Sequence, residues 1–156
     1  MKYRLKITDE ESKKEINVSE DEIIEVKYKI GLAEDTNLAN SRSTVEMEIT
    51  GKIISNLENA GNNLNSENKS VNDDLYEINK KNIIDLVEWA ESYLQKSDYR
   101  NLEMFVDLGS NKKMDLKFTN MFVYNFLQEM SIEKGIGIFK LKLRQKFHQK
   151  NKLDIK

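Results

Sequence analysis

Apolar and polar residues alternate along several stretches of this chain, and the most regular of them covers residues 135–147. The side chains of a strand point alternately to its two faces, so this pattern predicts a strand with one apolar and one cationic face. The apolar face carries Phe139, Leu141, Leu143 and Phe147, and the cationic face carries Lys140, Lys142, Arg144 and Lys146. The cationic face is either a binding surface or the solvent-exposed side of a sheet.

The same alternation predicts further strands at residues 2–8, 15–18, 23–30, 42–54, 101–109, 110–120 and 121–130. In the stretch 42–54, Glu46 and Glu48 lie on the outer face, opposite a run of apolar residues. Gly51 in the same stretch predicts a bulge or a close backbone approach. The period slips near Asn120, which predicts a second bulge.

One helix is predicted over residues 82–96, where the apolar residues recur at helical spacing. Asn82 is the expected N-cap. The preceding residues 56–79 are rich in asparagine and have no period, so we expect a flexible excursion there. The polar tail 148–156 is expected to fray. The helix is thus predicted to interrupt a series of seven to eight strands.

A chain of 156 residues favours one domain, here residues 1–156. A series of strands with one inserted helix indicates a mainly β fold, built as an antiparallel β-barrel or sandwich. Proline is absent, which leaves the turns to Gly, Asn, Asp and Ser.

Charge and composition narrow the function classes. The formal net charge is −2, whereas a dedicated nucleic-acid binder or a basic membrane-surface protein usually carries a clear basic excess. Without cysteine, disulfides, thiol nucleophiles and cysteine-ligated metals are excluded. The N-terminus has no apolar run of the kind found in signal peptides, so we expect assembly in the cytoplasm without membrane insertion.

Candidate chemistry is sparse. His148 is the single histidine, and it lies in the tail without a convergent partner set. Glu46 and Glu48 are about 7 Å apart by strand geometry, a spacing that a pair of hydrolytic carboxylates could use. We favour a solvated sheet face, and we expect no catalytic, cofactor-binding or metal-binding site. The acidic outer residues of 42–54 can pair with the cationic strand.

Several stretches together resemble a known family. They are "IIEVKYKIG" followed by "SRSTVEMEITGKI", the helix "NIIDLVEWA" followed by "YRNLEMFVD", and "LKFTNMFVYNFLQEMSIEKGIGIFKLKLRQK". In element order and short β patterns they are similar to the Hcp-like tube proteins of type VI secretion and of phage-tail-like contractile systems. The resemblance spans most of the chain except the Asn-rich excursion and the tail.

The resemblance implies a barrel-like fold with a flanking helix, whose copies form hexameric rings that stack into a hollow tube. It implies a structural, non-enzymatic subunit whose main partner is itself, with sheath and baseplate proteins as further candidates and export as part of an injection apparatus. The candidate lumen or assembly face is Lys140, Lys142, Arg144, Lys146, Glu46 and Glu48. The alternative is a monomeric binding or adaptor module for an anionic or protein partner.

Overall fold

The computed structural model describes residues 1–33, 42–54, 67–93, 98–131, 133, 136–146 and 153–156. The strands are β1 (Lys2–Thr8), β2 (Glu15–Val18), β3 (Ile23–Ala33), β4 (Arg42–Ile53), β5 (Arg100–Gly109), β6 (Lys112–Ser131), β7 (Ile136–Gln145) and β8 (Leu153–Ile155). One helix, α1 (Glu67–Glu91), lies between β4 and β5 in the described chain. The mainly β fold with an inserted helix is as predicted.

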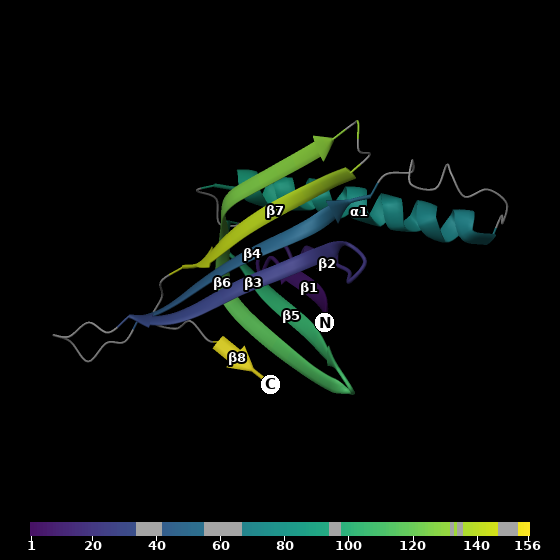
Figure 1. The fold of residues 1–156 in the computed structure, drawn as a ribbon. Coiled ribbons are helices and arrows are strands. Elements are labelled where there is room, and N and C mark those ends of the chain that lie inside the picture. Colours follow the sequence, from purple (N-terminus) through teal and green to yellow (C-terminus); the bar gives the residue numbers. More distant parts are fainter. Residues whose placement is uncertain (34–41, 55–66, 94–97, 132, 134–135, 147–152) are drawn as a thin grey trace.

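All strand pairs among the described residues are antiparallel, in the order β2-β1-β5-β6-β7-β4-β3, with β8 on β6. The sheet is open: β2 and β3 end the order, and it does not close into a barrel. Figure 1 shows how strongly β6 curves as it passes from one group of strands to the other.

The curve of β6 divides the sheet into two halves. Half A contains β2, β1, β5 and the first part of β6 up to Met121, with β8 beside it. Half B contains β3, β4, β7 and the rest of β6. The sequence predicted two strands, 110–120 and 121–130, where the structure has one strand bent at its middle. The predicted bulge near Asn120 is confirmed, because Asn120 has a positive φ of 54° and the β5–β6 register shifts beside it.

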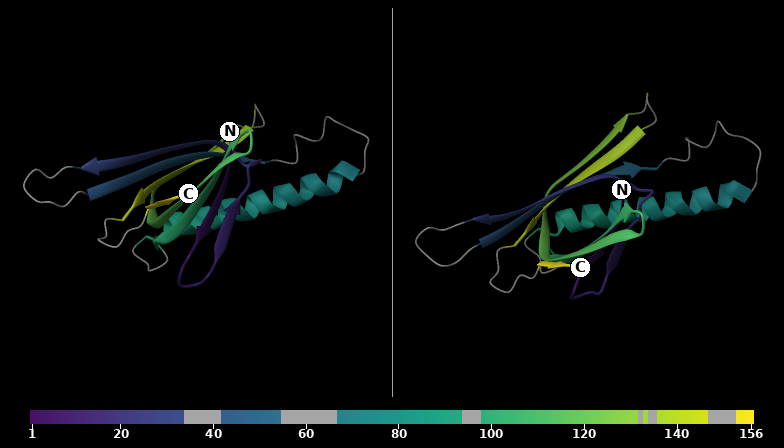
Figure 2. Two further views of the ribbon diagram at one scale, coloured as in Figure 1. Left: turned by 90° about the horizontal axis from the view of Figure 1, so that it is seen from below. Right: turned by 60° about the horizontal axis from the view of Figure 1, so that its bottom comes forward.

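The inner faces of both halves share one core with α1. Its fully buried side chains include Ile7, Leu102, Leu116 and Phe118 from half A, Met47, Ile49 and Phe139 from half B, and Trp89 from α1. The helix lies along one side of the bent sheet and reaches β2, β4 and β6, while its first turns extend past the strands (Figure 2). Alternation predicted the inward residues of β1, β4 and β7 correctly. It was wrong for β3, where Ile24, Tyr28 and Ile30 were expected inside but are 50%, 42% and 37% exposed.

Gly51 shows why the core of half B requires a glycine. A Cβ at this position would lie 2.2 Å from Cζ of Phe139 and 2.9 Å from the carbonyl oxygen of Glu22. The ring of Phe139 therefore packs directly on the Gly51 backbone. The predicted close approach is confirmed, and a register shift in β3 lies opposite the same glycine.

The helix prediction was wrong about where α1 begins. The helix starts at Glu67, so the part of the Asn-rich segment from 67 to 79 is helical, and residues 56–66 lie outside the described residues. Asn82 is a buried interior residue rather than an N-cap. The turns from 67 to 79 were not predicted because Asn79 occupies the buried face of the helix, where an apolar residue was expected.

The tail prediction was also wrong at its end. Leu153–Ile155 forms β8, which pairs with Leu116–Phe118 of β6, and Lys156 exchanges two backbone hydrogen bonds of 3.0 Å with Asp115. Residues 148–152, including His148, lie outside the described residues. The strand was unpredictable from periodicity because three residues are too few to show a period of two.

Candidate assembly surface

The outer face of half B carries charges in rows that cross the strands. The register places Glu46 between Lys29 and Arg144, and it places Glu48 between Lys27 and Lys142. These residues alternate with the core residues of the same strands, so all of them point away from the core. Half B therefore presents an outer face on which the carboxylates of β4 are flanked by cations of β3 and β7.

Two ion pairs fix β4 against β7 on this face. Nε of Arg144 lies 3.1 Å from Oε1 of Glu46, and Nζ of Lys142 lies 3.6 Å from Oε2 of Glu48. The guanidinium of Arg144 also lies 4.2 Å from the ring centroid of Tyr124, on β6. The predicted pairing of the cationic strand with Glu46 and Glu48 is confirmed for these two cations.

The other two cations of the strand have different surroundings. Lys140 is placed between Thr50 and Leu127, and it forms no ion pair within the described part of the chain. Lys146 follows the end of β7, and its Nζ lies 4.2 Å from the ring centroid of Tyr99. The four residues therefore do not act as one stripe. Lys142 and Arg144 are paired with glutamates, Lys140 has no ion pair among the described residues, and Lys146 lies over Tyr99.

Half B has two long open edges. Within the described chain, residues 25–30 of β3 pair only with β4, and residues 122–130 of β6 pair only with β7. These two stretches border the four strands on opposite sides (Figure 1). Half-exposed apolar side chains lie along them, including Tyr28, Ile30, Leu127 and Met130. Unpaired strand edges of this length are templates for pairing with another chain.

A buried polar cluster, which no pattern in the sequence indicates, anchors α1 to half B. Glu22 is fully buried; its carboxylate accepts hydrogen bonds from the Ser19 backbone N–H at 2.8 Å and from the side-chain amides of Asn79 and Asn82 at 3.0 and 3.1 Å. Asn79 also accepts from the Ile54 N–H at 2.8 Å and donates to the Lys52 carbonyl. The cluster fixes the helix to the end of β4.

A second buried cluster surrounds Arg100 beneath the C-terminal part of α1. The guanidinium lies 5.4 Å from the ring centroid of Trp89, and burial lowers the pKa of Arg100, with Asp9 the strongest opposing influence. Burial raises the pKa of Asp98. Burial would also raise the pKa of Asp9, but hydrogen bonds from Ser12 and Glu11, together with Arg100, hold that pKa below its usual value. These groups join α1, β5 and the β1–β2 turn.

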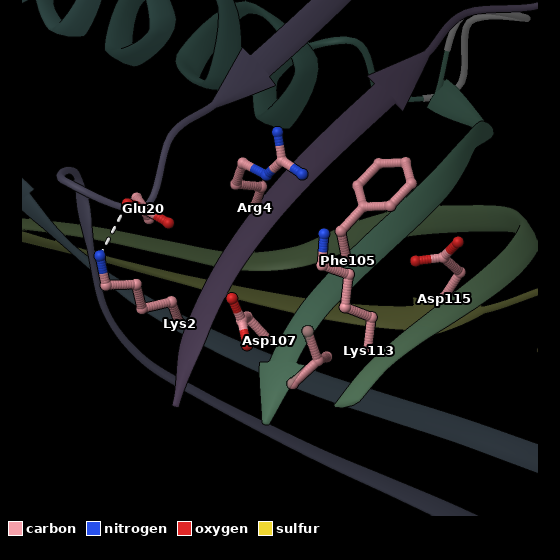
Figure 3. Close-up of a pocket in the computed structure, with 8 residues that line it drawn as sticks. Lys2, Arg4, Glu20, Phe105, Asp107, Lys113 and Asp115 are labelled. Atoms are coloured by element: carbon pink, nitrogen blue, oxygen red, sulfur yellow. Dashed lines mark hydrogen bonds and ion pairs between the residues drawn. The ribbon is translucent and has the colours of Figure 1, made fainter. Parts of the chain in front are cut away.

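The outer face of half A contains a shallow groove of about 320 Å³ (Figure 3). It is lined by Lys2, Arg4, Glu20, Phe105, Val106, Asp107, Lys113 and Asp115. Lys2 forms an ion pair of 3.0 Å with Glu20, and the guanidinium of Arg4 lies 5.6 Å from the Phe105 ring centroid. The lining has equal numbers of cations and carboxylates. None of the residues predicted as a site lines the groove.

The described residues offer little for catalysis. Glu46 and Glu48, the carboxylates considered for hydrolysis, are each engaged by a cation on an open sheet face. No group of three or more potential metal ligands occurs within the part of the chain that the structure describes. In the same residues, we find no helix that is both long and apolar enough to span a membrane.

Comparison with known proteins gives a clear result at the level of fold. No protein-family model and no curated protein matches the chain. Among solved structures, a mutant Hcp1 from E. coli EAEC 042 is similar over 100% of this chain and 98% of its own, with 10% identity and a TM-score of 0.56. A crystal structure of an Hcp protein is similar over 100% and 98%, with 9% identity and a TM-score of 0.50.

A third similar structure is a chain in the six-fold symmetrised baseplate of the anti-feeding prophage. It covers 99% of this chain and 92% of its own, with 5% identity and a TM-score of 0.50. The protein therefore has the fold of Hcp proteins and of this baseplate chain. The resemblance inferred from the sequence is confirmed at this level.

Proposed function

We propose that this protein is a non-enzymatic structural subunit that assembles with copies of itself into rings, and that the rings stack into the tube of a phage-tail-like or type VI-like injection apparatus. The observation that carries the proposal is the open four-stranded half B with a long unpaired edge on each side. The shared fold supports it.

The direction of the strands supports the proposed ring. Each strand in half B is antiparallel to its neighbour, so β3 and the second part of β6 run in opposite directions. In a ring, β3 of one copy would lie beside β6 of the next copy, and the two would be antiparallel. Such a contact joins two different surfaces, and it closes when the rotation between copies divides a full turn.

The ring number is proposed to be six. The baseplate to which the third similar structure belongs is described as six-fold symmetrised, and this supports the number without fixing it for this chain. Sheath and baseplate proteins are proposed as further partners. Assembly is proposed to occur in the cytoplasm, before any export with the apparatus.

The test is assembly with one edge blocked. Successive residues of a strand direct their N–H groups to opposite sides. Of the two variants Tyr28→Pro and Lys29→Pro, one therefore removes an N–H on the open side of β3, and the other removes an N–H that faces β4. Negative-stain microscopy and light scattering of the wild-type protein at high concentration should show rings. The variant that loses an outward N–H should keep the wild-type circular dichroism spectrum and form no rings.

Gly109→Ala provides a matched control for local backbone strain. Gly109 has a φ of +83°, so alanine is strained there, but the residue is the last of β5 in half A and lies away from both open edges. This variant should lose stability and still assemble. A wild-type protein that stays strictly monomeric at every concentration and salt condition contradicts the proposal.

A further inference from the structure

We infer that the outer face of half B is a binding surface for acidic protein segments, and that Lys52 and Lys140 form its recognition point. The face carries Lys27, Lys29, Lys52, Lys140, Lys142 and Arg144 against Glu25, Glu46, Glu48 and Glu129. It therefore has a net charge of +2, whereas the whole chain has a net charge of −2.

Ion pairs within the face neutralise some of its cations, so the unpaired positive charge is confined to a few lysines. Arg144 engages Glu46, Lys142 engages Glu48, and Lys27 engages Glu25 at 3.2 Å. Within the described chain, Lys29, Lys52 and Lys140 have no carboxylate within 4.0 Å. The cations available to a ligand are therefore these three lysines rather than the whole cationic strand.

Lys52 and Lys140 lie close together on this face. Lys140 is opposite Thr50 in the β4–β7 register, and Lys52 is two residues further along β4 on the same side. Diagonal neighbours of this kind are about 7–8 Å apart. Two like charges held at this distance without a carboxylate between them favour an anionic group from outside.

Apolar side chains beside the two lysines indicate the class of ligand. Leu127 is half-exposed next to Lys140, and the partly buried Ile138 is next to Lys52. A protein segment with separated carboxylates and apolar side chains complements these two lysines and the apolar side chains beside them. Duplex DNA fits poorly, because its uniform charge would also meet the four glutamates of the face.

The inference depends on the proposed function in one respect: ring closure would gather several copies of the face around one lumen. Repeated faces of one net sign in a narrow channel reinforce each other's potential and raise the local concentration of an oppositely charged ligand. A single copy still carries the complete recognition point, so binding can be measured separately from assembly.

The experiment measures binding of labelled poly-L-glutamate at low salt, with poly-L-lysine and a short DNA duplex as comparison probes. Lys52→Glu combined with Lys140→Glu should weaken poly-L-glutamate binding by about tenfold or more, and added salt should weaken wild-type binding. The neutral pair Lys52→Gln and Lys140→Gln should show a smaller loss in the same direction.

Lys112→Glu combined with Lys113→Glu is the matched control, because it changes net charge equally on exposed residues of half A. It should weaken binding by less than about threefold, the loss expected from net charge alone. Equal losses in the two charge-reversed proteins, or tighter binding of duplex DNA than of poly-L-glutamate, would overturn the inference.

Microscopy of the same samples separates the two proposals. Rings that form but bind poly-L-glutamate independently of Lys52 and Lys140 contradict the inference and leave the tube proposal intact. Lysine-dependent binding by a protein that never forms rings contradicts the tube proposal alone.

Discussion

The two halves of the sheet share one core, but their edge strands differ. In half A, the outermost strand β2 has only four residues, and β8 covers part of the outer edge of β6. In half B, both bordering stretches are long and unpaired within the described chain. Short or covered edges protect a sheet from association, and long open edges promote it. The contrast supports the proposal that subunits associate through half B rather than through half A.

The outer faces of the two halves also differ, in the balance of their charges. Half A pairs its charges locally, as in Lys6 with Glu15 at 3.1 Å and Lys117 with Glu103 at 3.6 Å, and the lining of its groove is balanced in charge. On half B, Lys29, Lys52 and Lys140 have no carboxylate within 4.0 Å among the residues that the structure describes. The groove of half A is thus balanced in charge, whereas the outer face of half B has a net positive charge available to a ligand.

The largest expected losses of stability come from substitutions in the core, and they should be similar in the two halves. Leu102→Ala in half A and Leu141→Ala in half B each remove a fully buried side chain. Each should lower the free energy of unfolding by about 2–5 kcal/mol. Chemical denaturation at concentrations that keep the protein monomeric would measure this. A loss below about 1 kcal/mol in one half alone would show that the halves do not share a core.

The buried Glu22 cluster should show the next largest effect. Asn79→Ala removes one donor to Glu22 and the acceptor for the Ile54 N–H, so unfolding should become easier by about 1–3 kcal/mol. Ile78→Ala is the neighbouring control; its side chain is half-exposed, so its effect should stay within about 0.5 kcal/mol. Thermal melts of the two variants would give the comparison, and equal shifts would contradict the role of the cluster.

Asp9 gives half A a pH dependence. Because its folded-state pKa lies below the ordinary value of about 3.9, Asp9 contributes stability that is present above pH 4 and lost as pH falls through the folded pKa. Asp9→Asn should therefore destabilise the protein at pH 7, and the difference from wild type should shrink below pH 4. Denaturation curves across this range test the sign, and a difference that grows on acidification would contradict it.

The smallest stability effect is expected on the outer face of half B. Glu46→Gln breaks the ion pair with Arg144. Because both side chains are about half exposed, the free energy of unfolding should fall by only about 0.2–1 kcal/mol. The same change raises the positive charge of the face and should strengthen binding of poly-L-glutamate. Stability and binding therefore move in opposite directions. A parallel loss of both would argue against the binding surface.

Much of this architecture could be predicted from the sequence, because alternation of period two identifies the buried face of most strands directly. It failed in β3, where the register shift beside Ile23 puts Ile23 rather than Ile24 in the core. Glu46 and Glu48 were correctly predicted to pair with the cationic strand, since opposite charges on alternating strands favour a common register. The bend of β6 was indicated in the sequence only by a break in the apolar–polar alternation near Asn120. No neighbouring residue indicated that one strand would pair with β5 in half A and with β7 in half B.

The remaining features depend on contacts between distant residues. Asn79 and Asn82 read as loop or cap residues, yet they are buried because Glu22, far away in the sequence, provides acceptors for their amides. Lys146 was grouped with the other cations by spacing, but β7 ends before it, and its partner is Tyr99. Local periodicity contains no information about such partners.

The central claim is that β3 of one copy pairs with the second part of β6 of the next copy. The chain has no cysteine, so introduced cysteines can be crosslinked without background. The measurement combines cysteine at Glu25, Lys27 or Lys29 with cysteine at Asn125, Leu127 or Glu129, and it scores disulfide-linked oligomers after mild oxidation. We expect a ladder of linked species for pairs that share one antiparallel register, and none when the second cysteine replaces Lys117 in half A. Crosslinking that is absent from all nine pairs, or equal to that of the half A control, would contradict the account.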